Sequence, residues 1–315
     1  MPHGAETKPQ ILLPYPGPDL TDSVQDIFVY LRPETNGVQV ESALVSVIRG
    51  YHDAATDNRL IYLANVPGQF IVERHIVEHH YADKLVFAVH GKRAFTESMR
   101  VQFEQRFDVK WSAARIIGSF EALQVFDKSP EELFTTWVPD NDITFIEGQT
   151  IKRIGDVYVV NYDIPALLHK NNRNTDIAVM LFRCTNGYDY FEDLVLAMHR
   201  ALVDKGLLSA GVHLSRAFHY SKGPFEQILD ARDYLYDGEG SSIDLRQLTF
   251  VQYAVRRGYE CRDLLGAVEN PISLFEQDDG SVVEKNLYTH TLNDTYEEAL
   301  EKMSRIRAQL WAHRF

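Results

Sequence analysis

The fold prediction starts from the run Arg59-Leu60-Ile61-Tyr62-Leu63-Ala64-Asn65-Val66, which is interrupted by Pro67-Gly68. This run is almost continuously apolar, as is typical of a strand covered on both faces. Similar short runs precede and follow it, separated by segments with apolar residues at helical spacing. Strands are predicted at residues 26–31, 84–89 and 176–182, and helices at 38–51, from 68 to about 81, at 94–107, and after Asn186-Gly187 to about 205.

This alternation of strands and helices predicts βαβ units. Their right-handed crossovers generate an α/β fold with a mostly parallel sheet and helices on both faces. Residues 143–146 and 157–162 suggest a strand pair, an antiparallel intrusion that makes the sheet mixed or divides the chain near residue 140. Ser129-Pro130-Glu131-Glu132 indicates the start of a helix, with Ser129 as the N-cap and Pro130 at the first helical position.

The two ends of the chain are expected to differ from this domain. Residues 1–20 are Pro-rich and aperiodic, and we expect an extended arm before an α/β domain at 21–210. From residue 211 the alternation weakens. Helices are predicted at 224–236, at 243–258 and, after Asn293-Asp294, through Leu310. Residues 211–315 are therefore expected to form a mainly helical third, either as a subdomain or as helices that cover the sheet.

Composition and charge narrow the classes of function. The formal net charge of −13 argues against broad binding to nucleic acid or to an anionic membrane. No stretch approaches the roughly 20 apolar residues that span a bilayer, and the N-terminus has no apolar signal-peptide core. The two cysteines, Cys184 and Cys261, form no disulfide framework, so a cytoplasmic location is expected.

The charge is unevenly distributed along the chain. Basic residues exceed acidic ones by four in residues 84–115, whereas acidic residues exceed basic ones by eight in residues 269–301. These segments could form two solvated faces that attract one another within the chain or between copies, which makes a homo-oligomer possible. Alternatively, the basic segment could bind an anionic ligand.

Polar turns after predicted strands are the candidate ligand-binding positions. Helix N-termini at such turns present unpaired N–H groups, and glycine lets a ligand approach the backbone closely. The candidates are Gly68, the turn His90-Gly91-Lys92-Arg93, the turn Thr185-Asn186, and Lys222 before a later helix. In the second turn, Lys92 and Arg93 could each reach a phosphate or a carboxylate. Such turns also serve simply to reverse the chain.

Histidines supply the candidates for proton transfer and for metal binding. His213 and His219 alternate with Ser215 and Ala217, so a strand would place them on one face, where either could act as a general acid or base; His90 is a third candidate. In His75-Ile76-Val77-Glu78-His79-His80, His75 and His79 are four residues apart, a spacing that suits two zinc ligands on a helix, with Glu78 as a base or ligand. No third ligand is specified nearby.

Three interpretations of function follow from these patterns. The first is a protein that binds a small anionic molecule and could use histidine as acid or base. The second is a non-catalytic regulatory or assembly subunit that acts through a protein partner. The third is a metal-dependent hydrolase built on His75, Glu78 and His79. The named phosphate-loop, dinucleotide, thioredoxin-like and hydrolase motifs are absent from the sequence, and no cofactor is indicated.

Overall fold

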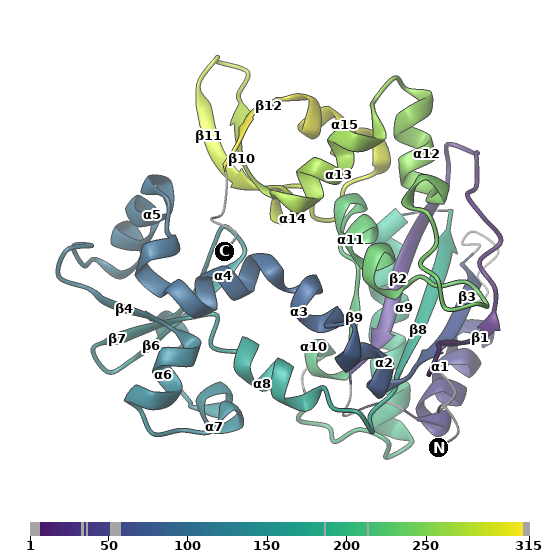
Figure 1. Cartoon of the computed structure of the whole chain (residues 1–315), viewed down its shortest axis with the longest axis horizontal. Helices are drawn as coiled ribbons and strands as arrows, with labels where there is room; N and C mark the ends of the chain where they lie inside the picture. The colour runs from purple at the N-terminus through teal and green to yellow at the C-terminus, as the bar shows by residue number, and fades with distance from the viewer. Residues whose placement is uncertain are drawn as a thin grey trace, which may run out of the picture. The chain divides into compact units, whose positions relative to one another are not determined.

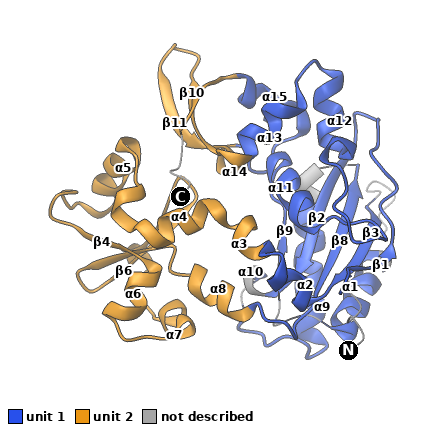
Figure 2. Ribbon diagram, viewed as in Figure 1, with its two compact units in different colours: residues 1–76, 171–268, 291–304 blue, residues 77–170, 269–290, 305–315 orange. Residues whose placement is uncertain are grey.

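The computed structural model describes residues 7–32, 35, 37–50, 58–185, 187–212 and 214–310. The chain divides into two units, and it passes between them several times (Figure 2). Unit 1 comprises residues 1–76, 171–268 and 291–304, and unit 2 comprises residues 77–170, 269–290 and 305–315. The boundaries predicted near residues 20, 140 and 210 stay predictions.

Unit 1 is built around a five-stranded antiparallel sheet (Figure 1). The strands are β1 (Gln10–Leu13), β2 (Gln25–Leu31), β3 (Arg59–Val66), β8 (Ile177–Cys184) and β9 (Phe218–Tyr220). Their spatial order is β1-β3-β8-β2-β9, and each neighbouring pair is antiparallel. All residues of β2 and β8 are buried, as expected for strands covered on both faces.

Helices cover both faces of this sheet. Alternate residues of β2 and β8, including Ile27 and Met180, pack into one core with α1 (Val38–Gly50) and α9 (Gly187–Asp204). The residues between them point to the opposite face, where α11 (Pro224–Tyr234) and α12 (Thr249–Arg256) contact β2. Unit 1 also contains α2 (Gly68–Glu73), α10 (Leu214–Ala217), α13 (Cys261–Glu269), α15 (Tyr296–Ser304) and a 3₁₀ helix (Leu245–Gln247). Helix α3 (Ile76–His80) begins in unit 1 and continues in unit 2, and the last residue of α13 belongs to unit 2.

A buried ion pair joins the two central strands of unit 1. Asp26 of β2 lies opposite Arg183 of β8, and the Arg183 Nε and Nη2 atoms donate to the two Asp26 oxygens at 2.7 and 2.9 Å. The Thr249 hydroxyl of α12 donates to the same carboxylate at 2.5 Å. Arg183 Nη2 also donates to the Gly17 carbonyl at 3.0 Å. The pair therefore ties the N-terminal arm and α12 to the sheet.

Unit 2 contains two smaller sheets. One has the order β4-β7-β6-β5, with β4 parallel to β7 and the other pairs antiparallel; the other is the antiparallel sheet β11-β10-β12. The strands are β4 (Arg115–Gly118), β5 (Ile143–Ile146), β6 (Gln149–Ile154), β7 (Val157–Val160), β10 (Ile272–Glu276), β11 (Val282–Asn286) and β12 (Ile306–Gln309). The helices are α4 (Ala82–His90), α5 (Glu97–Phe107), α6 (Ser119–Val125), α7 (Pro130–Thr135), α8 (Ile164–Lys170), α14 (Leu287–His290) and 3₁₀ helices at Gly91–Ala94 and Asp140–Asp142.

Both ends of α7 are satisfied by side chains. Ser129 and Glu132 form the capping box at its start, with Pro130 at the first helical position, which confirms the helix start predicted from the sequence. At the C-terminal end, the buried Lys152 of β6 donates to the carbonyl oxygens of Phe134, in the last turn, and of Thr136, the C-cap, at 2.8 and 3.0 Å. The ammonium also lies 3.8 Å from the centre of the Tyr162 ring. A cation at this position stabilises the carbonyl groups that a helix end leaves unpaired.

The prediction of a mostly parallel sheet is wrong. Among the described strands, only β4 and β7 pair in parallel. The apolar runs misled the prediction because helices cover both faces of the antiparallel sheet of unit 1. A strand that is buried on both faces has the same local pattern whichever way its neighbours run.

Several segments also differ from their predicted secondary structure. Residues 84–89, predicted as a strand, lie in α4, because a short apolar run does not distinguish a strand from a buried helix. The prediction that residues 143–146 and 157–162 form a strand pair is also wrong. These segments contain β5 and β7, and strand β6 lies between them in the sheet. The prediction of a mainly helical C-terminal third is also wrong, since strands β9 to β12 lie there. Residues 306–309 form β12 rather than the end of the last predicted helix.

Several other predicted segments are confirmed. The predicted strand at 59–66 corresponds to β3, and the predicted helices at 38–51 and 224–236 correspond to α1 and α11. Within the described part of the chain, no helix has the length and apolarity needed to cross a membrane.

Lys152 gives the stability of unit 2 a defined pH dependence. Burial, assisted by the nearby charge of Lys128, lowers the pKa of Lys152 from 10.5 to about 8, although Asp163 opposes the shift. Between these two values the unfolded chain binds more protons than the folded one, so the free energy of unfolding rises with pH. We expect wild type to gain stability relative to Lys152→Met as the pH is raised from 8 to 10.5, measured by urea unfolding. A constant difference across this range would show that the Lys152 pKa is not lowered.

Breaking the Asp26–Arg183 pair should destabilise unit 1 strongly. Either Asp26→Asn or Arg183→Met removes one partner and leaves the other in a buried site, which typically costs about 3–5 kcal/mol. The double variant leaves neither charge of the buried pair without its partner and should lose less than the sum of the two single variants. Denaturant unfolding of the four proteins measures this coupling, and strictly additive losses would contradict it.

Candidate functional site

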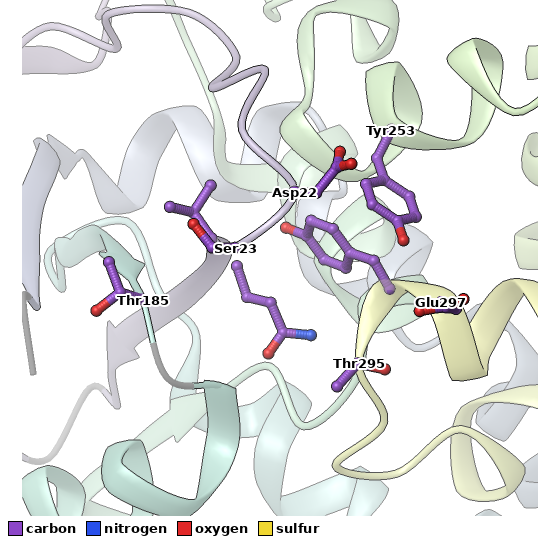
Figure 3. Close-up of a pocket in the computed structure, with 9 residues that line it drawn as sticks. Asp22, Ser23, Thr185, Tyr253, Thr295 and Glu297 are labelled. Atoms are coloured by element: carbon purple, nitrogen blue, oxygen red, sulfur yellow. The ribbon is translucent and has the colours of Figure 1, made fainter.

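A pocket of about 270 Å³ lies in unit 1, where four separate segments of the chain meet (Figure 3). Residues 22–25 lead into β2, and Thr185 directly follows β8. Tyr253 comes from α12, and residues 295–297 form the start of α15. The lining residues are Asp22, Ser23, Val24, Gln25, Thr185, Tyr253, Thr295, Tyr296 and Glu297.

The pairing of the central strands positions two of these segments. Gln25 and Cys184 are partners at the ends of β2 and β8, so the residues just outside the pair, including Thr185, come together at this edge. The next pair inward is Asp26 and Arg183. The pocket therefore lies immediately beyond the buried ion pair.

Charged groups at the pocket are largely balanced. Asp22 forms ion pairs with Arg256 at 3.5 Å and with Arg257 at 3.3 Å. The Arg257 guanidinium also lies 3.5 Å from the centre of the Tyr253 ring. Burial raises the pKa of Tyr253, and the carboxylates of Glu297 and Asp22 raise it further although Arg257 opposes them. Tyr253 is thus a neutral hydroxyl at physiological pH.

Several lining side chains already make hydrogen bonds that fix their positions. The Tyr296 hydroxyl accepts from the Asp26 backbone N–H at 2.9 Å and lies 3.0 Å from Gln227 Oε1, to which it donates. Gln25 Nε2 donates to the Asp294 carbonyl at 3.1 Å. Thr295 forms a capping box with Glu298 at the start of α15. These bonds hold the walls of the pocket in place.

Of the residues predicted from the sequence to bind a ligand, Thr185 lies in this pocket. Asn186, its neighbour in the predicted turn, lies outside the described residues. Lys222 is exposed near the start of α11; its backbone N–H donates to Glu226 and its carbonyl accepts from the Asn293 N–H. It does not line the pocket.

The two glycines predicted as ligand contacts are explained by packing. A Cβ on Gly68 would collide with the Asn172 carbonyl oxygen, and a Cβ on Gly91 would lie 2.5 Å from the Gly118 nitrogen. Gly91 also has a positive φ of 52°. Both positions therefore need glycine because other backbone segments approach them closely.

The His90-Gly91-Lys92-Arg93 turn lies in unit 2 at the end of α4, not after a strand. The Lys92 ammonium donates to the carbonyl oxygens of Trp111 and Ala114 at 2.6 and 2.9 Å. Arg93 is exposed, and His90 is half-buried as the last residue of α4. Lys92 is therefore held in place by two backbone carbonyl groups.

The histidines predicted for proton transfer are only partly described. His213 lies outside the described residues. His219 lies in β9, and its Nε2 is 3.4 Å from Asp230 and 3.9 Å from Glu226. Its ring stacks on Tyr30 at 4.4 Å. Whether these histidines act as acid or base stays a prediction.

The predicted zinc ligands do not form a recognisable metal site. His75 has a positive φ of 51° and precedes α3, which contains Glu78 and His79, so the three residues do not share one continuous helix. Among the described residues there is no group of three or more His, Cys, Asp or Glu side chains that could hold a metal ion. A metal-dependent hydrolase therefore gains no support.

Most of the pocket was not apparent from the sequence. Asp22, Tyr253 and Glu297 belong to segments far apart in the chain, and their meeting depends on the fold. One signal was available, because Thr295-Tyr296-Glu297-Glu298 has the spacing of a capping box. This signal would have predicted Thr295, rather than Asn293-Asp294, as the N-cap of α15.

Comparison with known proteins adds no further assignment. No protein-family model, no curated protein and no solved structure matches the chain.

The requirement for glycine at position 91 can be tested against a second glycine with a positive φ. Gly91 and Gly155 both have a positive φ, of 52° and 63°, but a Cβ at Gly155 would meet nothing within 4 Å. Gly155→Ala should therefore show the strain alone, about 1–2 kcal/mol. Gly91→Ala should lose more than this, because its φ of 52° and ψ of −125° lie outside the left-handed helical region and because the new methyl group is forced against Gly118. Equal losses of stability in urea unfolding would show that packing at Gly91 is not tight.

Proposed function

We propose that unit 1 binds a small polar molecule in the pocket between the start of β2, the end of β8, α12 and the start of α15. The observation that carries the proposal is that polar side chains from four segments of the chain line one pocket (Figure 3). Ligand sites commonly have this composition: a hollow with a few oriented polar groups on rigid elements. The lining hydroxyl groups of Ser23, Thr185 and Tyr253 can both donate and accept hydrogen bonds.

Apart from Thr185, the residues that line the pocket differ from those predicted from the sequence to bind an anionic ligand. Lys92 and Arg93 are not in unit 1, and Lys92 is engaged by two backbone carbonyls. The lining residues of the pocket include the carboxyl groups of Asp22 and Glu297 and no lysine or arginine. An anion is therefore not the ligand that these side chains favour. The alternative of an assembly subunit stays a prediction from the sequence.

The proposal can be tested by blocking the pocket. A library of small metabolites is screened by thermal shift and by ligand-observed NMR against wild type and against Ser23→Trp, which places an indole at the rim. A ligand at 100 times its Kd stabilises the folded protein by about 2.7 kcal/mol. We expect at least one compound whose stabilisation is present in wild type and absent in Ser23→Trp.

The matched control is Leu20→Trp. Leu20 is 56% exposed, lies three residues earlier in the same segment and does not line the pocket. This variant should bind the compound as wild type does. If no compound binds wild type, or if binding survives in Ser23→Trp, the pocket is not the binding site.

A further inference from the structure

We propose that Glu147 and Glu284 form a proton-dependent clasp, which holds the β10–β11 hairpin to the rest of unit 2 more firmly in acid than at neutral pH. The clasp lies in unit 2 and does not depend on the pocket of unit 1. Three features support it: the connectivity of the hairpin, the contacts of the two carboxyl groups and the charges around them.

The hairpin belongs to unit 2 through contacts rather than through its neighbours in the chain. Residues 269–290 contain β10 and β11 and lie in unit 2, whereas the segments directly before and after them belong to unit 1 (Figure 2). Ile272 packs into the apolar core around Phe103, and β12 pairs with β10. The other contacts with residues 77–170 include a group of buried polar side chains. A change in these polar contacts therefore alters how firmly the hairpin is held.

One carboxyl group of the clasp, that of Glu147, comes from the turn between β5 and β6. Glu147 and Gly148 have φ values of 44° and 82°, and a two-residue hairpin turn of this kind needs a positive φ at both positions. Glutamate adopts this conformation less readily than asparagine or glycine. The Glu147 side chain reaches β11, where Oε2 accepts from the Asn286 backbone N–H at 2.7 Å, and Oε1 accepts from Gln102 of α5 at 2.9 Å. The turn is thus bonded to the hairpin through a buried carboxylate.

The second carboxyl group, that of Glu284, comes from β11 itself. Glu284 and Asn286 are two residues apart in this strand, so their side chains point to the same face of the sheet. Both residues are buried, and Glu284 Oε1 accepts from the Thr96 hydroxyl at 2.5 Å. Thr96 is the N-cap of α5, the helix that also contains Gln102. The two carboxyl groups of the clasp are therefore bonded to the same helix.

Negative charge exceeds positive charge around the clasp. Lys285 of β11 lies 3.8 Å from Glu147 and is 44% exposed. Within the part of the chain that the structure describes, Glu284 forms no ion pair. The two groups from α5 that bond to the carboxylates are uncharged. Gln149 of β6 donates to the Glu147 carbonyl at 3.3 Å and to Asp83 of α4 at 3.1 Å, so a third carboxylate lies nearby. One cation thus faces two buried carboxylates.

Protonation of Glu284 removes the repulsion between these carboxylates. Burial raises the pKa of Glu284 above its ordinary value of 4.5; the Thr96 hydroxyl opposes this shift, and the charge of Glu147 adds to it. When the hairpin opens, Glu284 enters water and its pKa returns to about 4.5. Between the two pKa values the closed form binds more protons than the open form, so the free energy of opening falls as the pH rises. The clasp is therefore firm in acid and weaker at neutral pH.

Hydrogen exchange measures the opening of the hairpin directly. Exchange of the amides of residues 272–286 is followed by mass spectrometry in the whole protein at pH 5 and at pH 7.5, and each rate is corrected for the intrinsic effect of pH. Glu284→Gln keeps the shape of the protonated side chain and cannot ionise. We expect the ratio of protection at pH 5 to protection at pH 7.5 to be about threefold or more larger in wild type than in Glu284→Gln. Equal ratios in the two proteins would contradict the proposal.

Two further variants distinguish a carboxyl pair from a single buried acid. Glu147→Gln removes the neighbouring charge, so its ratio should lie between those of wild type and Glu284→Gln. The matched control is Glu276→Gln, which changes a carboxylate of the same hairpin that pairs with Arg307 of β12, and it should keep the wild-type ratio. If Glu147→Gln also keeps the wild-type ratio, the two carboxyl groups do not act together and the clasp is wrong.

A second measurement needs no variant and therefore does not depend on whether a variant folds. The side-chain carboxyl ¹³C resonance of Glu284 is followed by NMR as the folded wild-type protein is titrated. Its midpoint should lie above the ordinary pKa of 4.5, because the closed hairpin favours the protonated form. A midpoint at or below 4.5 would overturn the proposal, since acid would then loosen the hairpin or leave it unchanged.

Discussion

The ion pair between Asp26 and Arg183 is the interaction on which the organisation of unit 1 depends. It joins directly opposite residues of the two central strands, and both side chains are less than a tenth exposed. Removing two charges from water is costly, and the attraction between them repays this cost only when the remaining polar atoms are satisfied. Here the Thr249 hydroxyl and the Gly17 carbonyl complete the hydrogen bonding. The pair consequently specifies one register for β2 and β8, because a shift by one residue would leave both charges buried without partners.

The same constraint positions the candidate site. Because the ion pair fixes the ends of β2 and β8, the segment from Asp22 to Gln25 and Thr185 emerge side by side. Thr249, which bonds to Asp26, belongs to the same helix as Tyr253. Tyr296, at the start of α15, bonds to the backbone of Asp26. All four walls of the pocket are thus linked to one buried residue, Asp26, so a ligand would meet a surface that is already organised.

The sequence predicted local structure better than it predicted pairing. The apolar run at 59–66 is β3, and the signal at Ser129 is the start of α7, because each depends on residues that are close in the chain. The direction of the strands depends on contacts between distant segments. Asp26 and Arg183 are separated by 157 residues, and no local pattern indicates that they pair. For the same reason Thr185 could be chosen from its turn, whereas Asp22, Tyr253 and Glu297 could not.

The residues that resembled ligand contacts in the sequence show why such contacts are difficult to predict. Glycine next to a cation suits an anion, but it equally suits a fold in which backbone segments pass closely and leave carbonyl groups to be satisfied. Gly91 accommodates Gly118, and Lys92 satisfies two carbonyl oxygens in the same unit. Lys152 does the same beyond the end of α7. A polar side chain therefore indicates a ligand site only when the structure shows that it lines a cavity. Thr185 meets this criterion and Lys92 does not.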